Sequence, residues 1–237
     1  MNIAIVGGTG TVGAAAARAL TERGHAVRVL SRHAPEYPVD LVTGEGLERA
    51  LAGADVVIDA AGGTRKVLVD GTQRLLRAER AAGVQHHIGV SIVGIDRVGG
   101  PYYKLKLEQE AAIRDGGVPW TILRATQFHP FVAAIFAKSA KLGVVPSLGA
   151  PMQPVDPREV GRTLAVAAEA APTFTIAEFT GPEVVSVREL AKRWRTATGS
   201  HAVPLPLPAS RALRAGGLTS ATAPHGTVTF DDYLAAA

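Results

Sequence analysis

The side chains with the clearest chemical potential are a tyrosine and a lysine four residues apart, Tyr102 and Lys106. Residues at i and i+4 share one helix face, and apolar spacing predicts a helix over 102–115. A neighbouring ammonium favours the phenolate, so we expect Lys106 to lower the pKa of Tyr102 from about 10 and to permit proton exchange near neutral pH. Ser91, at the end of the preceding predicted strand, is placed to hydrogen-bond a substrate oxygen. A solvent-facing pair on an amphipathic helix is the alternative.

A glycine-rich turn at residues 7–13, Gly-Gly-Thr-Gly-Thr-Val-Gly, is the second chemical pattern. It separates an apolar run, 1–6, from an alanine-rich stretch, 14–23, which predicts strand, turn and helix. Such a turn brings the backbone close to a pyrophosphate, which then binds the N–H groups and the dipole of the helix N-terminus. Ala14 stands where a Walker A loop needs lysine, so that type of loop is excluded. A tight turn without a ligand is the alternative. The predicted cofactor contacts are Gly7, Thr9, Gly10, Thr11, Val12 and Gly13.

The end of the second predicted strand, 25–30, indicates which nicotinamide cofactor the turn would hold. Enzymes that use NAD usually carry an acid here, on the ribose 2′-hydroxyl. This sequence has Ser31-Arg32-His33 instead, and its first acid is Glu36. A guanidinium suits a 2′-phosphate, so we expect NADP(H) to be favoured over NAD(H), with Ser31 and Arg32 as contacts. Arg32 as an ordinary surface arginine is the alternative.

Alternating elements position these residues. Apolar runs predict strands at 1–6, 25–30, 55–61, 87–93 and 120–123, and helical spacing predicts helices at 14–23, 46–51, 67–82 and 102–115. Strands separated by helices predict an α/β fold with a doubly wound parallel sheet of the Rossmann type. After Thr126 prolines interrupt the pattern, and helices are predicted only at 157–169 and 187–198. We therefore expect an NAD(P)-binding Rossmann domain at 1–126 and a smaller C-terminal, substrate-binding lid at 127–237, packed on it.

The composition fits a compact enzyme with a small-molecule substrate. Of the 237 residues, 47% are hydrophobic and 19% charged, and the absence of cysteine excludes disulfides and thiolate chemistry. The net charge of +4 is spread along the chain without a basic run, so nucleic acid is not an expected partner. No apolar run has the length of a membrane span, and no basic segment precedes the first strand, so we expect a cytoplasmic protein. Nothing in the sequence indicates a metal site.

Together these features resemble the short-chain dehydrogenase/reductase superfamily, and more narrowly its extended and atypical NAD(P)H-binding branch, the NmrA-like proteins. The resemblance covers nearly the whole chain, through residues 7–13, 39–41, 55–62, 90–91, Tyr102 with Lys106, 120–126, 153–156 and 181–183. It implies that Asp40 and Leu41 flank the adenine and that Ala60, Ala61 and Gly62 line the cofactor. It also implies that Lys106 binds the nicotinamide ribose, that Tyr102 is the acid/base, and that the segment after Leu123, with Gln127 and Phe128, borders the nicotinamide and the substrate. The link from Arg32 to Asp40 is short, and Ala125 replaces a proline common in extended members.

The sequence thus predicts an NADP(H)-dependent oxidoreductase that acts on a small carbonyl, enone or quinone. Two alternatives remain open at this point. One is a redox-sensing, NADP-binding regulator without turnover, and the other is a redox-neutral epimerase or isomerase that retains its cofactor. The intact Tyr102/Lys106 pair favours either enzyme over the regulator, and no residue pattern identifies the substrate.

Overall fold

A computed structural model describes residues 1–236, which form two compact units. The first unit contains residues 1–91, 100–124 and 157–177, and the second contains residues 92–99, 125–156 and 178 onward. The expected division at residue 126 stays a prediction. However, the chain returns to the first unit at residue 157, so the two units are interleaved in sequence rather than consecutive.

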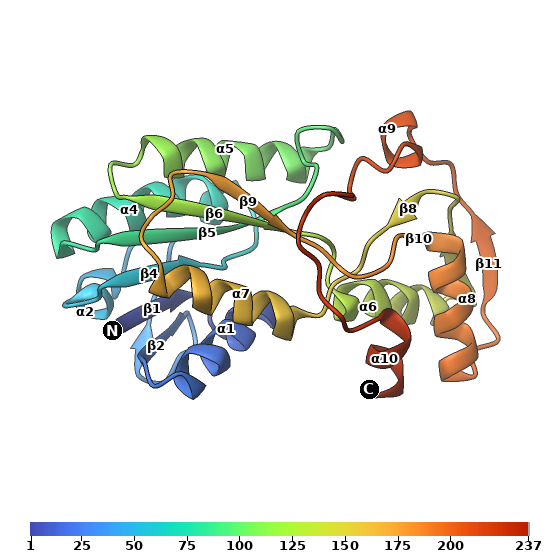
Figure 1. The fold of residues 1–237 in the computed structure, drawn as a ribbon, viewed down its shortest axis with the longest axis horizontal. Helices are drawn as coiled ribbons and strands as arrows, with labels where there is room; N and C mark the ends of the chain where they lie inside the picture. The colour runs from blue at the N-terminus through green and yellow to red at the C-terminus, as the bar shows by residue number, and fades with distance from the viewer. Residues whose placement is uncertain (237) are drawn as a thin grey trace. The chain divides into compact units, whose positions relative to one another are not determined.

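The first unit is built on a parallel sheet with the strand order β3-β2-β1-β4-β5-β6-β9 (Figure 1). The strands are β1 (Asn2–Val6), β2 (Ala26–Ser31), β3 (Tyr37–Pro38), β4 (Val56–Asp59), β5 (His86–Ile92), β6 (Trp120–Ala125) and β9 (Ile176–Phe179). β1 pairs in parallel with both β2 and β4, so Val6 lies opposite Leu30 on one side and Asp59 on the other. The order reverses at β1, which confirms the predicted Rossmann-type doubly wound sheet.

Helices cover both faces of this sheet: α1 (Thr11–Glu22) and α7 (Pro157–Glu169) lie on one face, and α4 (Asp70–Ala82) and α5 (Pro101–Asp115) lie on the other (Figure 1). Short helices α2 (Leu47–Leu51) and α3 (Arg65–Leu68) complete the unit. The α1–α7 contact is very close, because a Cβ at Gly161 would lie 2.6 Å from the carbonyl carbon of Ala15. This packing places 157–169 in the first unit, whereas the sequence pattern places it in the C-terminal region.

Apolar side chains from the strands and from the helices over them form the core of the first unit. Leu30, Leu51 and Leu75 are fully buried within it. Burying each leucine contributes about 1.5–3 kcal/mol relative to leaving it in water. The strand ends that carry Ser31 and Asp59 are therefore held by a rigid sheet rather than by a mobile loop.

The second unit packs helices against two small two-stranded sheets, β10 with β8 and β11 with β7. Its elements are α6 (His129–Ala140), β7 (Val144–Ser147), β8 (Pro151–Met152), β10 (Val185–Ser186), α8 (Val187–Thr198), β11 (Val203–Pro206), α9 (Arg211–Arg214) and α10 (Phe230–Ala235). The rings of Phe136 and Trp194 lie 6.0 Å apart in its core, which also buries Phe230. The predicted helix 187–198 is confirmed, whereas α6 and α10 are additional to the predicted elements.

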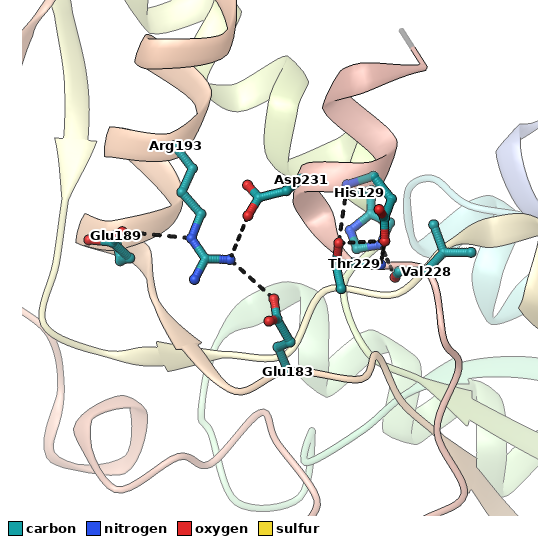
Figure 2. A network of polar contacts seen from close by, with 8 residues as sticks. His129, Glu183, Glu189, Arg193, Val228, Thr229 and Asp231 are labelled. Carbon is teal, nitrogen blue, oxygen red and sulfur yellow. Dashed lines mark hydrogen bonds and ion pairs between the residues drawn. The ribbon is translucent and has the colours of Figure 1, made fainter.

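An arginine on α8 ties the C-terminal helix to its own unit. Arg193 Nη1 lies 3.1 Å from Glu183 Oε2 and 3.2 Å from Asp231 Oδ2, and its Nε lies 3.7 Å from Glu189 Oε1 (Figure 2). Thr229 caps α10 through a reciprocal capping box with Asp232. A short α10 of this kind needs such caps, because an isolated helix of this length is unstable in water.

Among the described residues, no helix combines the length and the apolar character that crossing a bilayer requires.

Candidate cofactor and active site

A cleft of about 550 Å³ opens at the carboxyl ends of β1, β2 and β4. This is the point where the strand order reverses, the usual ligand site of an open α/β sheet. The cleft lies wholly within the first unit. Ten residues predicted to contact the cofactor line it: Gly7, Thr9, Gly10, Ser31, Arg32, Asp40, Leu41, Ala60, Ala61 and Gly62.

The glycines of the turn serve different structural purposes. Gly7 has a φ of +71°, and a Cβ there would lie 2.8 Å from the carbonyl oxygen of Ala60. A Cβ at Gly13 would lie 2.3 Å from the carbonyl oxygen of Gly7, so both glycines are needed for the turn itself. Gly10 has an ordinary extended φ of −81°, and its Cβ would approach the Gly7 oxygen only to 3.2 Å. Of these three glycines, Gly10 is therefore the one that the fold needs least, and it lines the cleft.

The first turn of α1 offers backbone donors beside this loop. No side chain caps the helix and no acid lies in its first turn. The N–H groups of residues 11–13 have no carbonyl partner within the helix, as at any helix N-terminus. Thr11, Val12 and Gly13 are not among the residues lining the cleft, and Thr11 borders a separate groove between α1 and α7. Their predicted contacts thus rest on backbone N–H groups, the groups that bind phosphate at helix N-termini.

Basic side chains border the cleft where the second strand ends. Arg32, His33 and Lys66 all line it, and Asp40 is the only acid among its lining residues. Asp40 Oδ1 accepts a hydrogen bond from the Val42 N–H at 2.7 Å, which folds the carboxylate onto its own loop. Lys66 was not among the predicted contacts. Its signal in the sequence is its position shortly after Gly62-Gly63, at the carboxyl end of β4.

Two observations show that the cleft fits a dinucleotide. The hydroxyl of Ser31 is buried and has no hydrogen-bond partner among residues 1–236, although buried polar groups are normally paired. A ribose hydroxyl or a phosphate would pair with it. The glycine turn supplies the second observation, because a loop without side chains lets a pyrophosphate reach the backbone.

Tyr102 lies beside this cleft, near the start of α5. Its phenolic oxygen is 3.9 Å from the position that a Cβ at Gly62 would take, so the hydroxyl approaches a segment that lines the cleft. The side chain is partly buried, and this burial raises the pKa of Tyr102. The predicted lowering of the Tyr102 pKa by Lys106 is therefore wrong for this structure. The reason is that the Lys106 ammonium is directed to other partners.

Lys106 is buried, and its ammonium contacts β5 of the sheet. Its Nζ donates to the carbonyl oxygen of Val90 at 2.7 Å and to Oε1 of Gln109. Burial lowers the pKa of Lys106 to about 8, against the opposing effect of the Asp59 and Glu110 carboxylates. Two of the three ammonium protons are therefore used by the protein, and one remains for a ligand.

Ser91 belongs to a buried ionic cluster that the sequence patterns did not reveal. Its hydroxyl donates to Oε1 of Glu110 at 2.6 Å. Arg124 binds the same carboxylate through two parallel hydrogen bonds, each 2.8 Å long. The i+4 spacing of Lys106 and Glu110 was the one sequence pattern that pointed to charged groups on this helix face. The role of Ser91 toward a substrate stays a prediction. Because its hydroxyl proton is donated to Glu110, the Ser91 oxygen could only accept a hydrogen bond from the substrate.

Gln127 and Phe128 belong to the second unit. Both side-chain polar atoms of Gln127 are buried without a hydrogen-bond partner among residues 1–236. Its backbone is fixed, because the Val155 N–H donates to the Gln127 carbonyl oxygen at 2.9 Å and Phe128 bridges to Val155. An amide held in this way can give and accept hydrogen bonds with a polar ligand. Substrate contact by these two residues stays a prediction.

Comparison with known proteins agrees with this geometry. The NAD(P)H-binding family model matches residues 7–130. A (4-alkanoyl-5-oxo-2,5-dihydrofuran-3-yl)methyl phosphate reductase from Streptomyces griseus is 32% identical over 206 residues, which cover 79% of this chain and 70% of that protein. A ceramide reductase from Caulobacter vibrioides is 30% identical over 169 residues, covering 62% of this chain and 53% of its own length.

Solved structures show the same fold. The NADPH complex of an NADPH-dependent quinone oxidoreductase from Escherichia coli superposes with a TM-score of 0.82, at 17% identity, and 99% of each chain is covered. A triphenylmethane reductase from Citrobacter sp. has a TM-score of 0.73 at 20% identity, over 88% of this chain and 79% of that one. With its glycine turn, its cleft at the β1 switch point and these relatives, the chain belongs to the NAD(P)H-binding oxidoreductase family, within the extended and NmrA-like short-chain dehydrogenase/reductase superfamily.

Proposed function

We propose that this protein is an NADP(H)-dependent reductase of a small carbonyl, enone or quinone. The observation that carries the proposal is the approach of the Tyr102 phenol to Gly62 in the lining of the cofactor cleft. That placement puts a proton donor beside the segment predicted to border the cofactor. A reductase needs such a donor, because hydride addition leaves negative charge on a substrate oxygen.

The choice of NADP(H) over NAD(H) rests on the charges around the cleft. Arg32, His33 and Lys66 border it, and the one lining acid, Asp40, is hydrogen-bonded to its own loop. A 2′-phosphate is a dianion that a guanidinium binds through charge-assisted hydrogen bonds. A free 2′-hydroxyl would gain nothing comparable from these cations.

The chain's own residues would then work as follows. The cofactor, when bound, supplies the hydride. Tyr102 gives its phenolic proton to the substrate oxygen and recovers a proton from solvent, which reaches its partly exposed side chain. A phenol is protonated at neutral pH, the state that a proton donor needs before each turnover, and burial raises the pKa of Tyr102 further. Lys106 holds a ribose hydroxyl with its remaining N–H, and Ser91 orients the substrate through its oxygen.

The names of the relatives narrow the substrate search. They include reductases of a dihydrofuranone phosphate, a quinone and a triphenylmethane dye. These compounds share conjugated, electrophilic carbon skeletons, so we place enones and quinones ahead of simple aldehydes. Contact of the substrate with Gln127, whose amide has no hydrogen-bond partner among residues 1–236, stays a prediction.

Oxidation of NADPH in the presence of a panel of enones, quinones and simple carbonyls tests the proposal. We expect turnover with at least one conjugated substrate, and a reduced product in equal amount to the NADPH consumed. Firm NADPH binding without oxidation across the panel would overturn the reductase assignment and favour a cofactor-binding regulator. Conversion of a substrate without net NADPH loss would favour a redox-neutral isomerase.

A further inference from the structure

A buried chain of hydrogen bonds leads from Lys106 to a carboxylate that no proposed catalytic step uses. The ammonium of Lys106 donates to Oε1 of Gln109, and Nε2 of Gln109 donates to Oδ2 of Asp59 at 3.0 Å. All three side chains are almost fully buried, with Asp59 completely excluded from solvent. The amide can point only one way, because its oxygen must face a donor and its nitrogen an acceptor.

The same carboxylate also holds the cofactor-lining segment. Oδ1 of Asp59 accepts from the Ala61 N–H at 3.1 Å, and Oδ2 accepts from the hydroxyl of Thr72 at 2.9 Å. Ala61 lies between Ala60 and Gly62 in the lining of the cleft. Asp59 is therefore bonded on one side to the wall of the cleft and on the other, through one amide, to the lysine.

We propose that Asp59 is a positioning residue for Lys106, acting through Gln109, so that one buried carboxylate fixes both the lysine's ammonium and the cofactor-lining segment around Ala61. The proposal rests on the proposed function in one respect, the role of Lys106 toward the cofactor ribose. The hydrogen bonds orient the ammonium and leave its third N–H for that ribose. The negative charge raises the pKa of the ammonium, against the burial that lowers it.

The pKa of Lys106 depends on the charged and titratable groups that surround it. Glu110 lies one turn further along α5, and the Arg124 guanidinium on β6 neutralises it through two hydrogen bonds. Tyr102, one turn earlier on the same helix, is an uncharged phenol at neutral pH, and burial raises its pKa further. Asp59, which lies at the end of β4, is the other carboxylate that acts on Lys106, and together with Glu79 it also raises the pKa of His87 on β5 against the lowering effect of burial. Its removal should therefore be felt directly by the lysine.

The test uses the Asp59→Asn variant in the cofactor-free protein. The new amide nitrogen opposes either the Gln109 Nε2 donor or the Ala61 N–H, depending on its orientation, and the negative charge is lost in both cases. We expect the pH midpoint of Lys106, followed by NMR of its ¹³C-labelled Cε, to fall by about one unit from the wild-type value. The chain has six lysines, and the signal that disappears in Lys106→Arg identifies the right one.

Moving the negative charge from position 59 to position 109 should restore the Lys106 midpoint. In Asp59→Asn combined with Gln109→Glu, a carboxylate again faces the ammonium, and the midpoint should return toward the wild-type value. Thr72→Val is the matched control, because it removes a donor to Asp59 and a second acceptor of Gln109 Nε2, but keeps the carboxylate and the Gln109–Asp59 hydrogen bond. It should lower the melting temperature and leave the Lys106 midpoint in place.

An unchanged midpoint in Asp59→Asn, or an equal shift in Thr72→Val, overturns the proposal. If Asp59→Asn does not fold, Gln109→Met interrupts the chain at similar volume; the midpoint should fall there too, and an unchanged value is decisive against the relay. In parallel, the loss of NADPH affinity at alkaline pH should begin at lower pH in Asp59→Asn. The NMR titration requires no turnover, so it separates failure of this inference from failure of the reductase assignment.

Discussion

Removal of the Arg32 guanidinium should selectively weaken the binding of NADPH. Arg32 lines the cleft but is exposed, so solvent and salt screen its charge. A hydrogen bond to a charged group contributes about 1.5–3 kcal/mol, and exposed ion pairs contribute less, about 0–1 kcal/mol. For a contact to a dianionic phosphate at this half-open site, we expect Arg32→Ala to cost about 1–2 kcal/mol. That corresponds to about 5–30-fold weaker NADPH binding.

Calorimetric titration of wild type and variant with NADPH and NADH measures this effect. NADH affinity should change by less than about twofold, because NADH has no 2′-phosphate for the guanidinium to bind. The gap between the cofactors should shrink at high salt. Arg77→Ala is the matched control, since Arg77 is an exposed arginine on α4 that does not line the cleft.

Two results would refute the reasoning. The first is equal affinity of the wild type for NADPH and NADH, which would leave the basic border of the cleft without a role. The second is an Arg32→Ala variant that loses NADH and NADPH affinity alike. A residual preference for NADPH in the variant fits the account, because His33 and Lys66 remain, and it should fall further in Arg32→Ala combined with Lys66→Ala.

Three further predictions concern the turn and the helix. Gly10→Val should abolish NADPH binding, measured by calorimetry, while the circular dichroism spectrum remains native. Gly13→Ala should instead lower the melting temperature, because its Cβ would lie 2.3 Å from a backbone oxygen. Retained NADPH binding in Gly10→Val would mean that the loop is only a turn. Tyr102→Phe should reduce turnover by about 10²-fold or more and leave NADPH affinity nearly unchanged, while Tyr103→Phe, about 100° around the helix, should matter little; full activity in Tyr102→Phe would contradict the acid role. NADPH affinity should decline as pH rises through about 8, where Lys106 loses its proton, and Lys106→Arg, which stays charged, should remove that decline in a fluorescence titration.

The sequence was most informative where local pattern and long-range structure agree. The run 1–6, the glycines at 7–13 and the helix after them form one local unit, so their conformation could be predicted without knowing their neighbours. The same holds for Gly83, which adopts a φ of +75° as the C-cap of α4, as its position after an apolar helical pattern predicts. The cleft at the carboxyl ends of β1, β2 and β4 follows from these local units and from the order of the strands.

Other features depend on contacts that the sequence does not reveal. Pro130 looks like a helix breaker but occupies the first turn of α6, where proline is well tolerated. The predicted helix 67–82 is divided at Val69 into α3 and α4. The predicted effect of Lys106 on Tyr102 was wrong for a related reason. Helical spacing places two residues on one face, but it does not reveal that Gln109 offers the ammonium a closer partner.

The central claim is that this chain transfers hydride from NADPH to a substrate while Tyr102 supplies the proton. Reduction of the best panel substrate with NADPH that carries deuterium at both positions of nicotinamide C4 tests it most directly. The account predicts one deuterium per product molecule at carbon, one solvent-derived proton at oxygen or at the conjugate position, and NADP⁺ in equal amount. Product without deuterium, or cofactor recovered unchanged with its label, would contradict it.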